Sequence, residues 1–201
     1  MDMRETVKKA IHYGAIQCIL QYYICPEECE AHCCKNGQIH IFEEEYRNFS
    51  QIDPEKAKKI QSEMPASPLY RIETPCSFLK AHDRCGVYYQ RPIVCGLYPF
   101  KVNTSGNSIG LQPCPVGFLI IREFASWMIA NVSKTGMAEE EKAKVIAEWE
   151  NTIESYAEEL SGFHMKNTLK EIQIPFDELE MFAMYMASKD LPKINAGVDL
   201  G

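Results

Sequence analysis

Apolar residues recur every three or four positions near the N-terminus and again in the C-terminal half of the chain, which is the spacing of amphipathic helices. The N-terminal stripe consists of Ile11, Ala15, Cys18, Ile19 and Tyr22. The stripe nearer the C-terminus consists of Val145, Trp149, Ile153, Tyr156 and Leu160. We therefore predict helices within residues 1–24, over residues 138–160 and, by the same spacing, over residues 176–186.

Between these helices the patterns are shorter. A helix is predicted from Pro26, a favoured first-turn residue followed by two glutamates, to a stop at Asn36-Gly37. Residues 38–42 form the pattern of a short strand, and Asp53-Pro54 begins another predicted helix. The proline-rich region that follows is mostly loop, with one hairpin predicted from strands at 100–102 and 108–112.

The fold class predicted from this pattern is α+β and mainly helical, with a small antiparallel β element and helices in the C-terminal half. Strands and helices do not alternate, so a doubly wound sheet is excluded. All nine cysteines lie between Cys18 and Cys114, and the rest of the chain contains none. We therefore predict a cysteine-rich domain over residues 1–117, and a helical extension over residues 118–201 that packs on it.

Charge and composition narrow the classes of function. A net charge of -7 argues against a nucleic-acid surface, which needs a basic stripe. The most apolar segment, residues 116–132, carries Arg122 and Glu123 near its middle and is short for a membrane span. No secretory signal pattern is present at the N-terminus, so we expect a cytoplasmic protein. In a reducing cytosol, nine cysteines are better explained as metal ligands than as a disulfide framework.

The cysteines of the first cluster have an unusual spacing. Cys25, Cys29 and Cys33 lie four residues apart, which on a helix would bring them close to a single stripe. Cys34 would point about 100° away from that stripe. The adjacent Cys33 and Cys34 indicate either two neighbouring metal centres or one large cluster with ligands from both sides. We treat Cys18, on an apolar helical face, as a buried free thiol.

Eight cysteines remain as predicted metal ligands, and eight thiols divide naturally into two sets of four, the number that binds tetrahedral zinc or an iron–sulfur cluster. The predicted metal ligands are Cys25, Cys29, Cys33, Cys34, Cys76, Cys85, Cys95 and Cys114. His32 and His82 lie within the cysteine intervals and are alternative zinc ligands that we favour less.

The motifs around these cysteines resemble the zinc- or iron-chelating cysteine-cluster family, called CxxCxxCC or YkgJ-like. The matching blocks are CPEECEAHCC at 25–34, PCSFL at 75–79, CGVYYQRPIVCGLYPF at 85–100 and CPVG at 114–117. The resemblance covers about residues 20–120 and implies metal chelation through the matched cysteines. Two departures stand out: the first block has gaps of three residues where the family name implies two, and Gly96 stands where such proteins commonly carry arginine.

Two residues of the third block are candidates for contact with the bound group. Arg91 can donate hydrogen bonds to sulfur and neutralise thiolate charge, with an ion pair to Glu73 as the alternative. Tyr88 can shield the site from water, with ordinary aromatic packing as the alternative.

These features predict a metal-binding protein that carries an iron–sulfur cluster, with 4Fe–4S favoured, or zinc, in a redox, maturation or sulfur-handling role. One alternative is a metal-dependent enzyme of methyl or sulfur transfer with an open metal position. Another is a structural zinc protein that acts by binding an unknown protein partner. The sequence has no glycine-rich cofactor loop, no G-x-S-x-G motif and no HExxH motif. We therefore favour the enzyme alternative less than the metal-binding protein.

Overall fold

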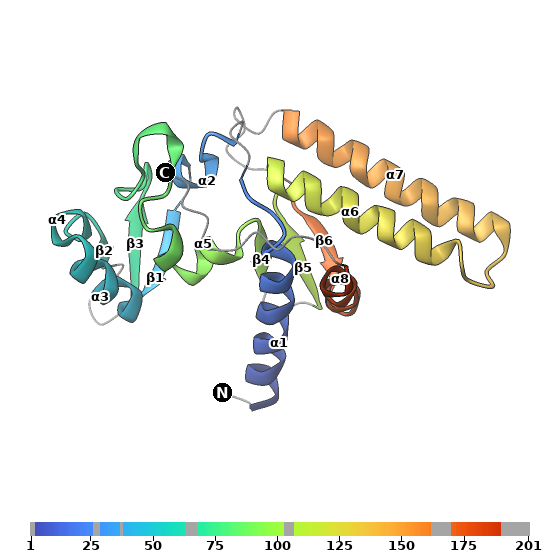
Figure 1. Ribbon diagram of the computed structural model, residues 1–201, viewed down its shortest axis with the longest axis horizontal. Coiled ribbons are helices and arrows are strands. Elements are labelled where there is room, and N and C mark those ends of the chain that lie inside the picture. Colours follow the sequence, from blue (N-terminus) through green and yellow to red (C-terminus); the bar gives the residue numbers. More distant parts are fainter. Residues whose placement is uncertain are drawn as a thin grey trace. The chain divides into compact units, whose positions relative to one another are not determined.

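The computed structural model describes residues 3–25, 29–36, 38–62, 68–102, 107–161 and 170–189. The chain forms two compact units: unit 1 contains Met1–Pro26 and Pro99–Gly201, and unit 2 contains Glu27–Tyr98. It is mainly helical with two small antiparallel sheets, which confirms the predicted fold class (Figure 1). The two units divide the chain after Pro26 and after Tyr98 and not at the predicted domain boundary after residue 117. The predicted domain boundary stays a prediction.

Unit 1 contains the long helices. These are α1 (Met3–Leu20), α6 (Pro115–Val132), α7 (Glu139–Ser161) and α8 (Phe176–Ser188). Three of them confirm the helices predicted within 1–24, over 138–160 and over 176–186. Helices α6 and α7 lie side by side, and α1 packs on α8 (Figure 1). At the centre the ring of Phe124 contacts Trp149 and Phe182, each with 5.1 Å between ring centroids.

The buried face of α1 differs from the predicted stripe. Ala15 and Ile19 are buried as predicted, but Ile11 is 52% exposed and Ile16 is fully buried. The neighbouring His12 is buried as well, because its ring stacks on Phe176 of α8 with 3.6 Å between centroids. The imidazole of His12, covered by the Phe176 ring, thus lies on the packed face of α1, where the pattern had predicted the side chain of Ile11.

The sheet of unit 1 extends the predicted hairpin by a strand from far along the chain. Its strands are β4 (Phe100–Val102), β5 (Ser108–Leu111) and β6 (Ile172–Pro175), in the order β4-β5-β6. The antiparallel pairing of β4 with β5 confirms the hairpin, whereas β6 was not predicted. Ile109 and Ile174 face each other in the register and are fully buried, so the added strand closes the core.

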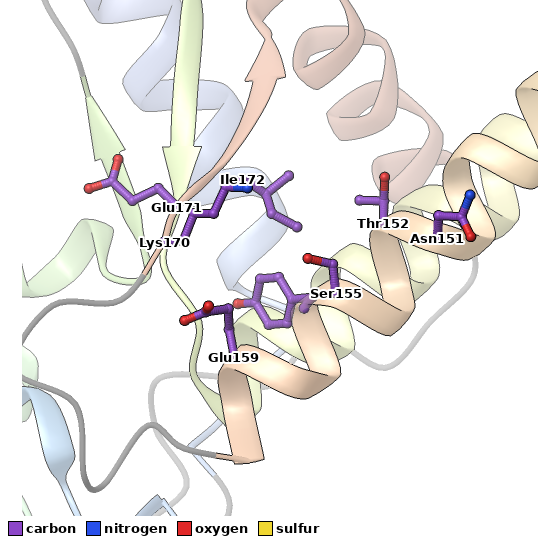
Figure 2. A pocket seen from close by; sticks show the side chains of 8 residues that line it. Asn151, Thr152, Ser155, Glu159, Lys170, Glu171 and Ile172 are labelled. Carbon is purple, nitrogen blue, oxygen red and sulfur yellow. The ribbon is translucent and has the colours of Figure 1, made fainter.

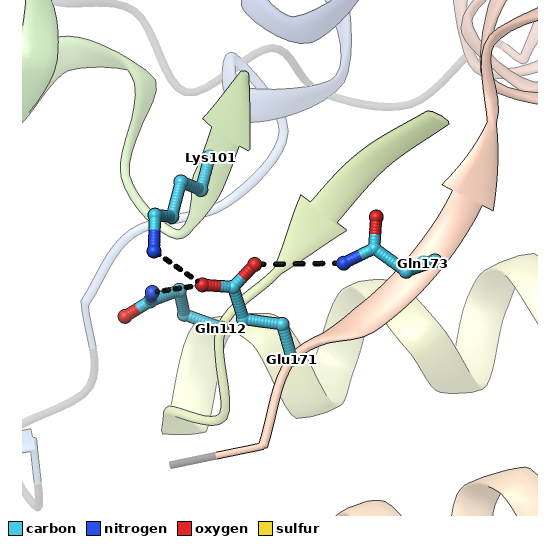
Figure 3. Close-up of polar contacts among 4 residues, drawn as sticks. All are labelled: Lys101, Gln112, Glu171 and Gln173. Carbon is cyan, nitrogen blue, oxygen red and sulfur yellow. Dashed lines mark hydrogen bonds and ion pairs between the residues drawn. The ribbon is translucent and has the colours of Figure 1, made fainter. Parts of the chain in front are cut away.

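A glutamate carboxylate ties the three strands of this sheet together. Glu171, next to β6, accepts hydrogen bonds from Lys101 at 2.6 Å and from Gln112 at 3.0 Å, and a longer one from Gln173 at 3.5 Å. Figure 3 shows these donors arranged around the one carboxylate. Because the partners come from both sides of the hairpin, the network holds β6 in register.

Helix α6 is long and apolar enough to cross a membrane when judged by length and composition alone. A buried core helix of a soluble protein passes the same test. In this structure Ile120, Ile121 and Phe124 of α6 are fully buried in unit 1. The apolar composition of α6 is therefore accounted for by packing within the unit.

Unit 2 contains a second three-stranded antiparallel sheet. Its strands are β1 (Gln38–Phe42), β2 (Gln61–Ser62) and β3 (Leu69–Glu73), in the order β1-β3-β2. Its helices are α2 (His32–Lys35), α3 (Glu43–Ile52), α4 (Pro54–Ala57) and α5 (Ile93–Leu97), with short 3₁₀ turns at Ala81–Asp83 and Tyr88–Gln90. Strand β1 matches its prediction, whereas α3 and β3 were not predicted. The side chain of Asp53 caps α4 by accepting the Lys56 N–H at 3.0 Å.

The sheet and α3 enclose a hydrophobic core of their own. Its buried members are Ile39, Ile41, Phe49, Ala57, Ile60, Ile72, Phe78 and Val87. Three partly buried thiols, those of Cys76, Cys85 and Cys95, pack against this core. The predicted ligands of the middle region are therefore supported by a folded core.

The helix predicted over residues 26–36 is wrong for its described part. Only the short α2 forms, because Glu30 and Ala31 have φ angles of 48° and 52°, in the left-handed region that interrupts a right-handed helix. Residues 26–28 lie outside the described residues. Cys29 and Cys33 therefore do not lie on one face of a helix, although their spacing had predicted that they would.

Candidate metal centre

The structure divides the eight predicted ligands between the two units. Unit 2 contains Cys29, Cys33, Cys34, Cys76, Cys85 and Cys95. Cys25, which is exposed, and Cys114, which is buried, belong to unit 1. All nine cysteines of the chain are described and are free thiols. The predicted ligand set of eight stays a prediction, and unit 2 is where six of its members are found.

Two thiols are held by one compact turn. Cys76 follows β3, and its carbonyl oxygen accepts the Leu79 N–H at 3.0 Å; the N–H groups of Phe78 and Leu79 also act on its sulfur, in the direction that lowers the pKa of the thiol. The sulfur of Cys85 accepts the N–H of Val87, and Cys85 itself pairs with Leu79 in an antiparallel bridge. Backbone N–H groups directed at sulfur stabilise the thiolate form, which is the form that binds metals.

Gly86 allows the two sides of this turn to approach. Its N–H donates to the carbonyl oxygen of Phe78 at 2.8 Å. A Cβ atom at position 86 would lie 2.7 Å from that same oxygen, closer than real contacts allow. Glycine is thus required next to Cys85 because the opposite backbone occupies the space of a side chain.

Cys95 is placed by α5, and Glu45 fixes the start of that helix. One carboxylate oxygen of Glu45 accepts the N–H of Ile93 at 2.7 Å, and the other accepts the N–H of Phe42 at 2.8 Å. The carboxylate thereby satisfies free N–H groups at the beginnings of both α5 and α3. Neither the role of Glu45 nor that of Gly86 was predicted, because each depends on a contact with a distant segment.

Cys34 connects α2 to the loop of Cys76. The carbonyl oxygen of Cys34 accepts the N–H of Cys76 at 2.8 Å. An ion pair of 2.8 Å between Lys35 and Asp83 joins the same two segments. Two separate contacts therefore bring the first cysteine motif of the chain to the second.

The thiols influence one another electrostatically. Burial raises the pKa of Cys76, of Cys85 and, to about 12, of Cys95, and the charge of Cys34 raises all three further. The pKa of Cys34 itself is lowered, chiefly by a hydrogen bond from the Cys33 thiol and also by the charge of Arg91. The thiols of unit 2 thus lie near one another: Cys34 acts on Cys76, Cys85 and Cys95, and Cys29 and Cys33 act on Cys34.

Arg91 lies near these thiols and also contacts the Tyr88 ring. The guanidinium carbon of Arg91 is 4.5 Å from the centroid of the Tyr88 ring. The positive charge of Arg91 lowers the pKa of Cys34, Cys85 and Cys95. The alternative partner, Glu73, forms an ion pair with Arg71 at 2.7 Å. Arg91 therefore offers the charge compensation that a set of thiolates needs.

The two candidate histidines have other surroundings. The His32 ring is 3.1 Å from the Asn36 side-chain nitrogen, and His82 is exposed with a φ of 59°. Among the residues that the structure describes, no three or more Cys, His, Asp or Glu side chains stand at ligand distances from one point. Chelation by unit 2 therefore requires its thiols to draw inward and lose protons. The all-sulfur donors, the N–H groups on sulfur and the Arg91 charge fit zinc or iron.

Cys114 has a defined local role in unit 1. It is the N-cap of α6, and its sulfur accepts the N–H of Gly117 at 3.2 Å. Its own N–H donates to the Tyr156 hydroxyl at 3.3 Å, and that hydroxyl donates to the Gln112 carbonyl at 2.5 Å. Burial raises the pKa of Tyr156, so the hydroxyl stays protonated as a donor. Cys18, predicted as a free thiol, contacts the Ala183 carbonyl at 3.5 Å.

A hollow of about 300 Å³ lies in unit 1 between α7 and the start of β6 (Figure 2). Its lining residues are Asn151, Thr152, Ser155, Tyr156, Glu159, Lys170, Glu171 and Ile172. None of them is a cysteine, and Thr152, Tyr156 and Glu171 already hydrogen-bond to Glu148, Gln112 and Lys101. The hollow therefore contributes no thiol to a metal site.

Comparison with known families identifies the cysteine-rich region of the chain. Residues 24–115 match the model of the CxxCxxCC family, described as a putative zinc- or iron-chelating domain. The matched range runs from the residue before Cys25 to the residue after Cys114 and confirms the resemblance found in the sequence. No curated protein and no solved structure matches the chain.

Proposed function

Since residues 24–115 match the model of the CxxCxxCC family, we propose that this chain is a metal-binding protein whose centre is ligated by Cys34, Cys76, Cys85 and Cys95. One arrangement carries the proposal: the Cys34 carbonyl bonds the Cys76 N–H at 2.8 Å, Cys85 lies in the same turn as Cys76, and Cys76, Cys85 and Cys95 pack against one core. Four sulfur ligands are the number that zinc and iron–sulfur clusters take.

The iron–sulfur form is the one we favour, in a redox, maturation or sulfur-handling role. A set of sulfur donors without nitrogen or oxygen suits the soft ligand preference of such clusters. Arg91 and the N–H groups on Cys76 and Cys85 supply hydrogen bonds and charge of the kind that tunes cluster potentials. The partly buried thiols remain within reach of a partner protein or a donor of metal.

A structural zinc site is the second candidate. Cys76, Cys85 and Cys95 pack against the core of unit 2, so an ion bound there would brace the turn of Cys76 and Cys85 and helix α5 against one core. Metal binding that depends on the fold in this way adds directly to the free energy of unfolding. Zinc would serve this role without redox chemistry.

The test is purification without oxygen, followed by an absorbance spectrum and analysis of iron, zinc and acid-labile sulfide. Broad visible absorption with iron and sulfide in comparable amounts supports the cluster, and a colourless protein with bound zinc supports the second candidate. Cys95→Ser is expected to lower the metal content in either case, because serine is a poor ligand for soft metals. Cys18→Ser is the matched control and should retain the wild-type content. Full metal in Cys95→Ser would contradict the ligand assignment.

A further inference from the structure

The polar side of α7 faces the hollow of unit 1. Asn151, Ser155 and Glu159 line the hollow and lie four residues apart, so they share one side of the helix. Figure 2 shows Ser155 and Glu159 directed toward the start of β6. The apolar side of α7 packs on α6, where Trp149 contacts Phe124 with 5.1 Å between ring centroids. The hollow therefore lies between a polar stripe of α7 and a strand of the sheet.

Three polar side chains of the lining have no partner within the part of the chain that the structure describes. There, Asn151, Ser155 and Lys170 take part in no side-chain hydrogen bond or ion pair. By contrast, the hydroxyl of Thr152, in the same lining, donates to the Glu148 carbonyl at 2.8 Å. An amide, a hydroxyl and an ammonium group are therefore available to a ligand, and each of the three can donate a hydrogen bond.

Opposite charges line the two sides of the hollow. Lys170, just before β6, supplies a positive charge, and the half-buried Glu159 of α7 supplies a negative one. Glu171 also belongs to the lining, but its ion pair with Lys101 at 2.6 Å compensates its charge. A carboxylate has about four acceptor sites, so Glu159 can accept from a ligand in addition to its contacts within the chain.

The hollow also has an apolar part and a limited size. Ile172 is half-buried, and the ring of Tyr156 packs on Phe118 of α6 with 6.2 Å between centroids. A volume of about 300 Å³ is at the lower end of the range of ligand pockets. At the volume that a water molecule takes in the liquid, it has room for about ten non-hydrogen atoms.

We propose that this hollow binds a free amino acid with an aliphatic side chain. Lys170 binds the carboxylate of the ligand, with Asn151 and Ser155 as further donors, and Glu159 accepts from its ammonium group. The aliphatic side chain lies against Ile172. A ligand with only a carboxylate fits less well because α7 is rich in glutamate, and one with only an amine leaves Lys170 without a partner. The lining contains no thiol, so this inference goes beyond the proposed metal centre and does not depend on it.

The test is calorimetric titration of the full chain with L-leucine. Two further probes, 4-methylpentanoate and 3-methylbutylamine, keep the aliphatic group but each lack one of the two charged groups. Leucine should bind at least about tenfold more tightly than either, because each charge-assisted hydrogen bond adds to the affinity. No saturable binding of leucine at millimolar concentration, or equal affinity for 4-methylpentanoate, would overturn the proposal.

Variants locate the site. Lys170→Gln and Glu159→Gln should each weaken leucine binding at least about tenfold, and Glu159→Gln should leave the affinity for 4-methylpentanoate unchanged or higher. Lys134→Gln is the matched control, because Lys134 is exposed between α6 and α7 and does not line the hollow. It should bind leucine as the wild type does. Wild-type affinity for leucine in either lining variant would overturn the proposal.

Amide NMR gives a readout of position. Leucine should shift the amide signals of residues 151–159 and 170–172 most strongly, because these residues surround the hollow. Saturable binding with its largest shifts in other segments would place the ligand elsewhere and overturn the assignment of the site.

Discussion

Replacement of Gly86 by alanine should disrupt metal binding through a single backbone contact. A Cβ at position 86 would lie 2.7 Å from the Phe78 carbonyl oxygen, whereas ordinary contact begins at 3.4 Å. The two strands of the turn must therefore separate by about 0.7 Å, more than the roughly 0.2 Å by which metal–ligand distances vary. Because Cys85 precedes Gly86, its sulfur moves with the backbone.

The same change should also lower stability. The Gly86 N–H to Phe78 carbonyl bond of 2.8 Å is lengthened or lost, and overpacking of a tight site costs about 1–3 kcal/mol. Gly96→Ala is the matched control, since Gly96 also follows a cysteine of the centre. Its added Cβ would meet only Arg91 Nε, at 3.8 Å, which is ordinary contact.

Zinc content per chain and the melting temperature with and without zinc would be measured for both glycine variants. Gly86→Ala should lose most of its zinc and melt at a lower temperature, while Gly96→Ala should behave as the wild type. If Gly86→Ala bound zinc fully and melted normally, the turn would not set the position of Cys85. If both variants lost zinc equally, the contact with Phe78 would not be the cause.

Three further predictions concern stability. Tyr156→Phe removes the buried hydrogen bonds to Gln112 and Cys114. It should lower the free energy of unfolding by about 1–3 kcal/mol in urea titrations and leave the metal content unchanged. An unchanged free energy of unfolding would show that neither bond contributes to stability. Glu45→Ala should lower the metal content, and it should lower the free energy of unfolding by about 1–2 kcal/mol in the same titration. The reason is that the N–H groups at the starts of α3 and α5 lose their acceptor. A wild-type metal content would refute a positioning role for Glu45. The pKa of Cys95 rises from 9.0 to about 12 on folding, so the metal-free fold should lose stability as pH rises from 9 to 12. Cys95→Ser should show a smaller loss across that range, and an equal loss would exclude Cys95 as its source.

Local patterns explain most of the helices and strands that were predicted correctly. Helices α1, α7 and α8 show apolar residues at helical spacing over many turns, and the β4–β5 hairpin lies within one short stretch of chain. These elements depend on neighbours in sequence, so their residues carry the signal. The cysteine motifs are local as well, which is why the family could be identified from the printed sequence and then matched over residues 24–115.

The missed elements depend on distant partners. Strand β6 forms because Ile174 completes the core beside Ile109, and β3 forms because Ile72 pairs with Ile39 of β1. The predicted helix across residues 29–33 fails because Glu30 and Ala31 are held in the left-handed region, a conformation that their side chains do not favour and that no residue pattern reports.

The sequence by itself determined the metal-binding class, the eight candidate thiols, and the helical character of both ends of the chain, since these follow from residue types and short spacings. Only the tertiary structure decided how the segments that carry the thiols of unit 2 are joined. The Cys34 carbonyl bonds the Cys76 N–H, Cys76, Cys85 and Cys95 pack against one core, and the Glu45 carboxylate bonds the start of the helix that carries Cys95. Spacing along a chain specifies neighbours within one element, whereas the arrangement of thiols from different elements is specified by the contacts between those elements.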